Sequence, residues 1–155
     1  MSKLYKYYII IISLLIGITA GMVQYDLIVP VFNPTGAHYH GITGKDQVSI
    51  SFNVDWGEEY IPGILRILDK KGVKVTFFIT GTWARKFPDL VQGMSLYGHE
   101  IGNHGYSHKR PKTLTNTALI DLIQKNEKLI YEITGKRTKL FAPPYGEVNK
   151  RITTV

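Results

Sequence analysis

The order of the predicted strands and helices indicates an α/β fold with parallel strands. Short segments rich in β-branched and aromatic residues alternate along the chain with longer segments of helical period. This alternation is typical of parallel sheets whose strands are joined by helices. Of the 155 residues, 44% are hydrophobic and 20% charged, and none is cysteine. The composition is therefore that of a folded domain without disulfides or thiolate metal ligands.

The first predicted elements are a strand, a helix and a second strand. Apolar residues occupy every second position from Val48 to Val54, which predicts a strand. Residues 58–71 place their apolar side chains on one helical face, and Gly72 is typical of a helix C-terminus. Residues 73–80 are rich in β-branched and aromatic types and predict a buried strand.

The next segment carries a helix, a strand and a loop. Residues 82–97 have a helical period, and Pro88 is expected to kink or split this helix. Residues 98–103 predict a short strand, which residues 104–111 follow as a loop. The strand places this loop at the edge of the sheet where parallel α/β folds collect functional residues.

Two further elements complete the predicted order. An amphipathic helix is expected over residues 113–134, with Gly135 as its stop, and a short strand over residues 139–142. No internal repeat is evident.

The N-terminal segment has the pattern of an export signal. Lys3 and Lys6 precede seventeen uncharged residues, from Tyr7 to Val23. Seventeen residues are at the lower limit for a bilayer span, so a cleaved signal peptide and a retained membrane anchor in residues 1–23 both stay open, as does a buried core helix. The first two alternatives predict an exported domain. Residues 24–45 lack a sustained period, contain several prolines and glycines, and are expected to be a linker.

The charge balance is basic. The net charge of +7 becomes +5 without Lys3 and Lys6, from 17 basic and 12 acidic residues. Such a balance suits an anionic cell wall or membrane surface as well as a nucleic acid. Because no basic run exceeds two residues and no nucleic-acid motif is present, we expect no nucleic-acid partner. The N-terminal segment leaves a membrane contact open.

Two histidines four residues apart, His104 and His108, follow the strand predicted at residues 98–103. Neutral imidazoles at this spacing can converge on one divalent ion, and zinc is a common choice. Asp55, at the end of the first strand, could supply a third ligand and leave open positions for water and substrate. The alternatives are two loop histidines without metal and a helix-capping role for Asp55.

A third segment, residues 141–146, also follows a predicted strand. Pro143 and Pro144 stiffen it and Gly146 permits a turn. Alone, it would be interpreted as an ordinary strand-to-helix connection.

Together these segments resemble the polysaccharide deacetylases of carbohydrate esterase family 4, the NodB-homology domain. The resemblance covers about residues 46–150, within a predicted domain of residues 46–155, and its elements occur in the family's order. The specific part is Gly98-His99-Glu100-Ile101-Gly102-Asn103-His104, leading to Ser107-His108. Weaker matches are Thr76-Phe77-Phe78-Ile79, Phe141 to Gly146, and Phe52-Asn53-Val54-Asp55-Trp56-Gly57, the last similar to sporulation-associated members.

The resemblance implies a distorted (β/α) barrel and metal-dependent removal of N-acetyl groups from peptidoglycan or a related N-acetylglucosamine polymer. A cell-wall polysaccharide is then the expected partner, and zinc or a similar divalent ion the expected cofactor. By position, His104 and His108 are the metal ligands and Asp55 the third. Tyr145 and Pro144 fall in the loop that shapes the substrate side.

The sequence departs from the family pattern at the catalytic base. The family has two adjacent carboxylates after its phenylalanine, where this chain has Asn53 and Val54. A neutral amide cannot accept the proton, and loss of a general base costs about 10² to 10⁴ in rate. Asn53 and Asp55 should point the same way along an extended strand, so Asp55 could replace one of the two carboxylates but not both. Ala142 stands where the family has an arginine that orients the base.

The family's later motifs, which supply a histidine for the leaving group, have no counterpart before Val155. A closed barrel usually needs more than about 200 residues. We therefore expect an incomplete barrel that is a fragment or a truncated member. Two functions follow from the sequence: a metal-dependent deacetylase, or a catalytically impaired glycan-binding member of the same fold.

Overall fold

The computed structural model describes residues 12, 36–39, 41, 44 and 46–155. The predicted leader, residues 1–23, lies outside the described residues except for Ile12, and so does most of the predicted linker. In the described part of the chain, no helix is both long enough and apolar enough to cross a bilayer. The elements follow in the order β1 (Ser51–Val54), α2 (Ile61–Lys71), β2 (Thr76–Ile79), α3 (Gly81–Lys86), α4 (Pro88–Leu96), β3 (Glu100–Asn103), α5 (Asn116–Thr134) and α6 (Lys150–Thr154), with 3₁₀ turns at Pro111–Thr113 and Pro144–Gly146.

The three strands form a parallel sheet in the order β1-β2-β3, which confirms the predicted α/β class. Val54 of β1 is in register with Ile79 of β2, which is in register with Asn103 of β3. All three strands therefore end at the same row. The residues that follow them share one edge of the sheet, where parallel folds place their binding sites.

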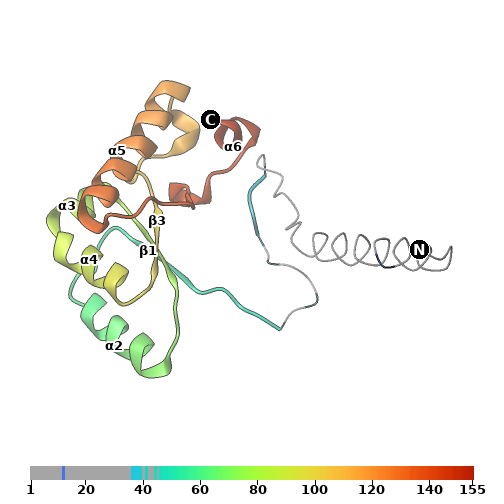
Figure 1. The fold of residues 1–155 in the computed structure, drawn as a ribbon. Coiled ribbons are helices and arrows are strands. Elements are labelled where there is room, and N and C mark those ends of the chain that lie inside the picture. Colours follow the sequence, from blue (N-terminus) through green and yellow to red (C-terminus); the bar gives the residue numbers. More distant parts are fainter. Residues whose placement is uncertain (1–11, 13–35, 40, 42–43, 45) are drawn as a thin grey trace, which may run out of the picture. The chain divides into compact units, whose positions relative to one another are not determined.

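The apolar core lies between the sheet and the helices. Phe77 and Ile79 of the central strand are fully buried, and Met94 of α4 and Ile130 of α5 are buried with them. Figure 1 shows α2, α3, α4 and α5 along one side of the three strands. Burying a side chain of this size stabilises a fold by about 1.5 to 3 kcal/mol, so this layer holds the sheet edge in place.

The helix boundaries follow local signals. α2 ends at Gly72, whose φ of 64° is the left-handed conformation that glycine adopts readily. The predicted helix over residues 82–97 is split between Phe87 and Pro88, as its proline indicated. α5 starts at Asn116 rather than at residue 113, because the Thr115 side chain accepts a hydrogen bond from the backbone N–H of Ala118 and caps the helix there.

The strands are shorter than predicted. Residues 48–50 precede β1, and Val48 is 91% exposed, because register pairing with β2 starts at Ser51. The prediction of a strand over residues 139–142 is wrong. This segment forms a single parallel bridge, between Asn103 and Phe141, instead of a paired strand. Residues 143 and 144 are both proline, which has no N–H to continue the pairing.

Candidate functional site

The candidate site is built on the residues that directly follow the three strands. Asp55, Thr80 and His104 come immediately after the aligned ends of β1, β2 and β3. Backbone bonds continue across this row: the N–H of Thr80 donates to Val54 at 3.0 Å and that of His104 to Ile79 at 3.1 Å. The Thr80 hydroxyl donates to Oδ1 of Asp55 at 2.6 Å. The sheet register thus brings Asp55 to the same edge as the histidine loop.

His104 is held firmly in one orientation. It is 2% exposed, and its Nδ1 lies 2.6 Å from the carbonyl oxygen of Ala142. A carbonyl only accepts, so Nδ1 carries the proton and Nε2 is left with a lone pair, the arrangement found in metal-binding histidines. Burial lowers the pKa of His104; the Ala142 carbonyl opposes this shift, the His108 charge adds to it and Asp55 opposes it. The neutral ring that a metal requires is therefore favoured.

His108 lies beside His104, as the sequence predicted. The centroids of the two rings are 5.1 Å apart. On the other loop, the Tyr145 ring centroid is 4.6 Å from that of His108, and the Arg110 guanidinium is 5.0 Å from the Tyr145 centroid. Tyr145 is 59% exposed and has a φ of 60°, unusual for a residue with a side chain. Pro144, in contrast, is fully buried.

A salt bridge holds the two loops together, and sequence reasoning missed it. Arg110 contacts the Glu147 carboxylate through Nε at 2.8 Å and through a terminal nitrogen at 2.7 Å. The backbone N–H of Lys112 donates to the other carboxylate oxygen at 3.0 Å. This N–H bond is the main reason that the pKa of Glu147 lies below its usual value; burial opposes the shift and Arg110 reinforces it. No sequence spacing marked the pair, because its members are 37 positions apart.

A buried pair of amide side chains, Asn103 and Asn126, holds the histidine loop in place. Oδ1 of Asn103 accepts from the N–H of Gly105 at 2.8 Å and from Nδ2 of Asn126 at 2.9 Å, and Nδ2 of Asn126 also donates to the carbonyl of Ile79. Nδ2 of Asn103 donates to the carbonyl of Ile123. The signal in the sequence was Asn126 itself, a polar residue on the apolar face of a helix.

The end of β1 is less tightly held. Asn53 and Asp55 are exposed while Val54 between them is 3% exposed, so the two polar side chains share a face as predicted. In the described part of the chain, the Asn53 amide makes no side-chain hydrogen bond, and Asp55 has only the hydroxyl of Thr80. Trp56, the next residue, is 77% exposed.

The chemistry of these donors suits a divalent ion. Two imidazoles and a carboxylate are a ligand set used by catalytic zinc. Among the described residues, however, no three histidine, aspartate or glutamate side chains are gathered closely enough to form a metal group. The structure thus brings His104 and His108 together. Asp55 lies at the same edge of the sheet, and its charge acts on the pKa of His104. Among the described residues, it does not complete a three-ligand group with the two histidines.

Comparison with known proteins relates the chain to the polysaccharide deacetylase family. The family model for polysaccharide deacetylase matches residues 40–155. The chain is 38% identical over 117 residues to the uncharacterized protein YlxY of Bacillus subtilis, covering 76% of this chain and 37% of that protein. It is 36% identical to a peptidoglycan-N-acetylglucosamine deacetylase of Bacillus cereus (71% and 40% covered). It is 35% identical to the peptidoglycan-N-acetylmuramic acid deacetylase PdaA of Bacillus subtilis (71% and 42% covered). The chain spans less than half the length of each.

The solved structures include a protein described as a pseudoenzyme and two of its mutants. A pseudoenzyme of carbohydrate esterase family 4 from Bacillus anthracis is 36% identical, with a TM-score of 0.70, covering 72% of this chain and 40% of that one. A mutant of this pseudoenzyme gives a TM-score of 0.75 at 34% identity, covering 77% and 44%. A further mutant, described as having restored enzymatic activity, gives 0.70 at 33% identity, covering 72% and 41%. The three parallel strands and their helices therefore correspond to part of this fold.

Proposed function

The chain belongs to the polysaccharide deacetylase family, and we propose that it binds N-acetylated cell-wall glycan with strongly impaired deacetylation. One observation carries this proposal. Asn53, an exposed amide that cannot take a proton, stands near the end of β1, at the sheet edge that also carries the buried, oriented His104 and its neighbour His108. On this proposal, the residues that bind are retained and the residue that accepts the proton is replaced.

We place a divalent ion, with zinc the best match by ligand chemistry, on His104, His108 and Asp55. Such an ion, when bound, polarises a carbonyl oxygen and lowers the pKa of water. Nε2 of His104 is available because Nδ1 is engaged by the Ala142 carbonyl. The Asp55 carboxylate follows the same row of the sheet and keeps a hydrogen bond from Thr80, which would hold it in place as a ligand.

The remaining residues favour binding over turnover. With Asp55 assigned to the ion, no carboxylate is left at the end of β1 for the role of base, and Ala142 offers no charge to orient one. Tyr145 presents an exposed ring next to His108, and flat aromatic surfaces of this kind suit the apolar face of a sugar. The ligand of the chain would be a peptidoglycan strand, the polymer that appears in the names of two of the relatives. The predicted leader would deliver the domain to the cell wall.

The second candidate is hydrolysis with Asp55 as the base. It is favoured by the exposed position of Asp55 and by the hydrogen bond from Thr80, which would hold the carboxylate in place. In that case His104 and His108 alone would hold the ion from the protein. Acetate release separates this candidate from the proposed one.

The proposal is tested on the purified full chain with zinc and a peptidoglycan fragment. We expect about one zinc per chain by elemental analysis, retention on the glycan, and no acetate release above background. The double variant His104→Ala/His108→Ala should lose the zinc, and His38→Ala should keep it. Equal zinc in wild type and double variant would refute the metal site. Acetate release that depends on both His104 and Asp55 would instead establish the second candidate.

A further inference from the structure

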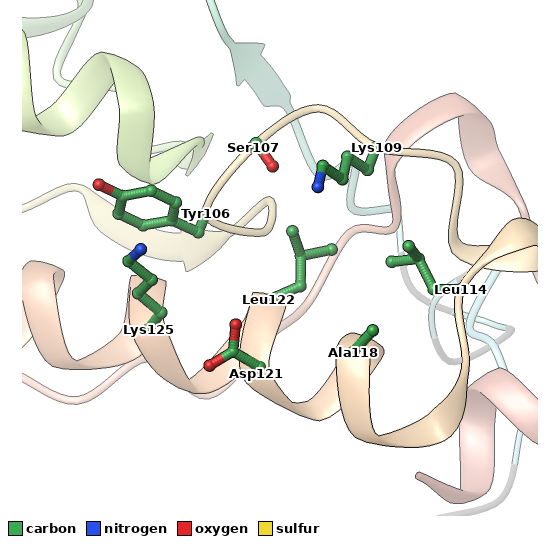
Figure 2. Close-up of a pocket in the computed structure, with 8 residues that line it drawn as sticks. All are labelled: Tyr106, Ser107, Lys109, Leu114, Ala118, Asp121, Leu122 and Lys125. Atoms are coloured by element: carbon green, nitrogen blue, oxygen red, sulfur yellow. The ribbon is translucent and has the colours of Figure 1, made fainter.

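A pocket of about 330 Å³ lies between the loop after β3 and the N-terminal half of α5. Tyr106 and Ser107, which line it, stand in the sequence between the two histidines of the site. Figure 2 shows Ser107 and Lys109 reaching into the pocket from the loop, with Asp121 and Leu122 rising from the helix. The volume is in the range of small-ligand pockets. Neither the metal site nor the role of the base accounts for it.

The rim of the pocket is charged and short of protein partners. Lys109, Asp121 and Lys125 all line it, two cations against one anion. In the part of the chain that the structure describes, neither Lys109 nor Asp121 has an ion pair or a side-chain hydrogen bond. The ammonium of Lys125 lies 4.0 Å from the centre of the Tyr106 ring, an attraction that keeps this charge at the pocket rather than in open solvent.

The floor is apolar. Leu122 is 5% exposed, and Leu114 and Ala118 line the pocket beside it. Ala118, Asp121, Leu122 and Lys125 recur at helical spacing, so one face of α5 offers both the floor and part of the rim. A ligand that fits must therefore combine a small apolar group with polar ends.

The arrangement of charges selects among anions. Lys109 and Lys125 favour a negative group, but Asp121 on the same rim would repel a phosphate dianion. The Asp121 carboxylate only accepts hydrogen bonds, so it requires an N–H or O–H donor on the ligand. A carboxylate bearing an adjacent amide N–H and a methyl-sized side chain meets all three demands.

We propose that this pocket binds the carboxylate end of a short peptide with small side chains. Lys109 would hold the carboxylate, Asp121 the amide N–H, and Leu114 with Leu122 the side chain. This assignment of the ligand rests on the proposed function, because a peptidoglycan strand carries peptides and a plain N-acetylglucosamine polymer does not. The pocket would then select the peptide-substituted glycan for the neighbouring histidine site.

The test measures binding of N-acetyl-alanyl-alanine to the full chain by NMR titration, without added metal. We expect a Kd on the order of 1 mM, and binding about tenfold weaker for the C-terminal amide of the same peptide. Lys109→Met should weaken binding about tenfold. The matched control is Lys128→Met on the same helix, which should bind like wild type because Lys128 is not among the pocket residues.

Ala118→Leu provides a second variant that changes no charge. Ala118 is exposed, so a larger side chain there fills the pocket without disturbing the core. Binding should fall at least about tenfold while the melting temperature stays the same. Equal affinity for the amide, tighter binding of inorganic phosphate, or unchanged binding in Lys109→Met would each overturn the proposal. Because the assay contains neither metal nor glycan, its result is separate from that of the zinc experiment.

Discussion

The two halves of the candidate site are built differently. The histidine half is fixed: His104 is buried, its Nδ1 is engaged by the Ala142 carbonyl, and its loop is fastened by the Asn103–Asn126 amide pair. The carboxylate half, at the end of β1, consists of exposed side chains, of which only Asp55 has a side-chain hydrogen bond among the described residues. A substitution at Asn53 therefore costs the fold little, whereas one in the histidine loop disturbs its packing.

Because of this difference, loss of turnover in such a protein would not require loss of its architecture. The polar side chains at the end of β1 are held by few contacts, so an amide can replace a carboxylate there without a structural penalty. His104 and the Asn103–Asn126 amide pair are buried and hydrogen-bonded, and leaving one such group unpaired would cost about 1 to 3 kcal/mol. Selection for stability alone would thus retain the histidine half.

The largest expected effect comes from Asn53→Asp, which directly tests the difference between the two halves of the site. Restoring a carboxylate at an exposed position should leave the melting temperature nearly unchanged and raise acetate release from a peptidoglycan fragment by about 10² to 10⁴. The measurement is enzymatic detection of acetate with zinc present. Asn53→Ala serves as the control and should stay at background. Full zinc content with no acetate from Asn53→Asp would show that something other than the base limits the chain.

Much of this comparison could be predicted from the sequence, but not all of it. The alternating strands and helices, the split at Pro88 and the pairing of His104 with His108 follow from local period and spacing. The salt bridge of Arg110 with Glu147 and the amide pair do not, because they join residues far apart in the chain whose types are ordinary on any surface or helix. Strand ends were missed for a similar reason: pairing with a neighbour, not propensity, decides where a strand begins.

The next effect tests the rigidity of the histidine half through Gly81. A Cβ at this position would lie 2.5 Å from the Tyr106 ring, 2.9 Å from Oδ1 of Asn126 and 3.1 Å from the Tyr106 backbone. Since backbone is among the close atoms, side-chain rotation cannot relieve the contact. Gly81→Ala should lower the free energy of unfolding by about 1 to 3 kcal/mol and reduce zinc binding.

Gly63 of α2 supplies the matched control. A Cβ added at this position would have no neighbour within 4 Å, so Gly63→Ala should stabilise the chain by about 0.5 to 1 kcal/mol through helix propensity. Both free energies come from denaturant unfolding. A Gly81→Ala variant as stable as wild type would mean that the loop is adaptable, and the contrast between the two halves would be lost.

The smallest effect concerns the bridge that joins the two loops. The pKa of Glu147 lies below its ordinary value of 4.5 in the folded chain, mainly because the Lys112 N–H donates to it. A depressed carboxyl pKa stabilises the fold above pH 4.5, and this contribution disappears as the pH falls through the folded pKa. Arg110 is 61% exposed at its side chain, so solvent screening keeps the effect small.

Glu147→Gln isolates this contribution. At pH 7 its melting temperature should lie below that of wild type, and the gap should close as the pH falls through the lowered pKa of Glu147, where the wild-type carboxylate becomes protonated. Glu132→Gln is the control, since its exposed carboxylate lies 3.9 Å from Lys128, and its melting temperature at pH 7 should equal that of wild type. A gap for Glu147→Gln that persists unchanged in acid would assign the role of Glu147 to packing. The histidine half would then be held by shape rather than by charge.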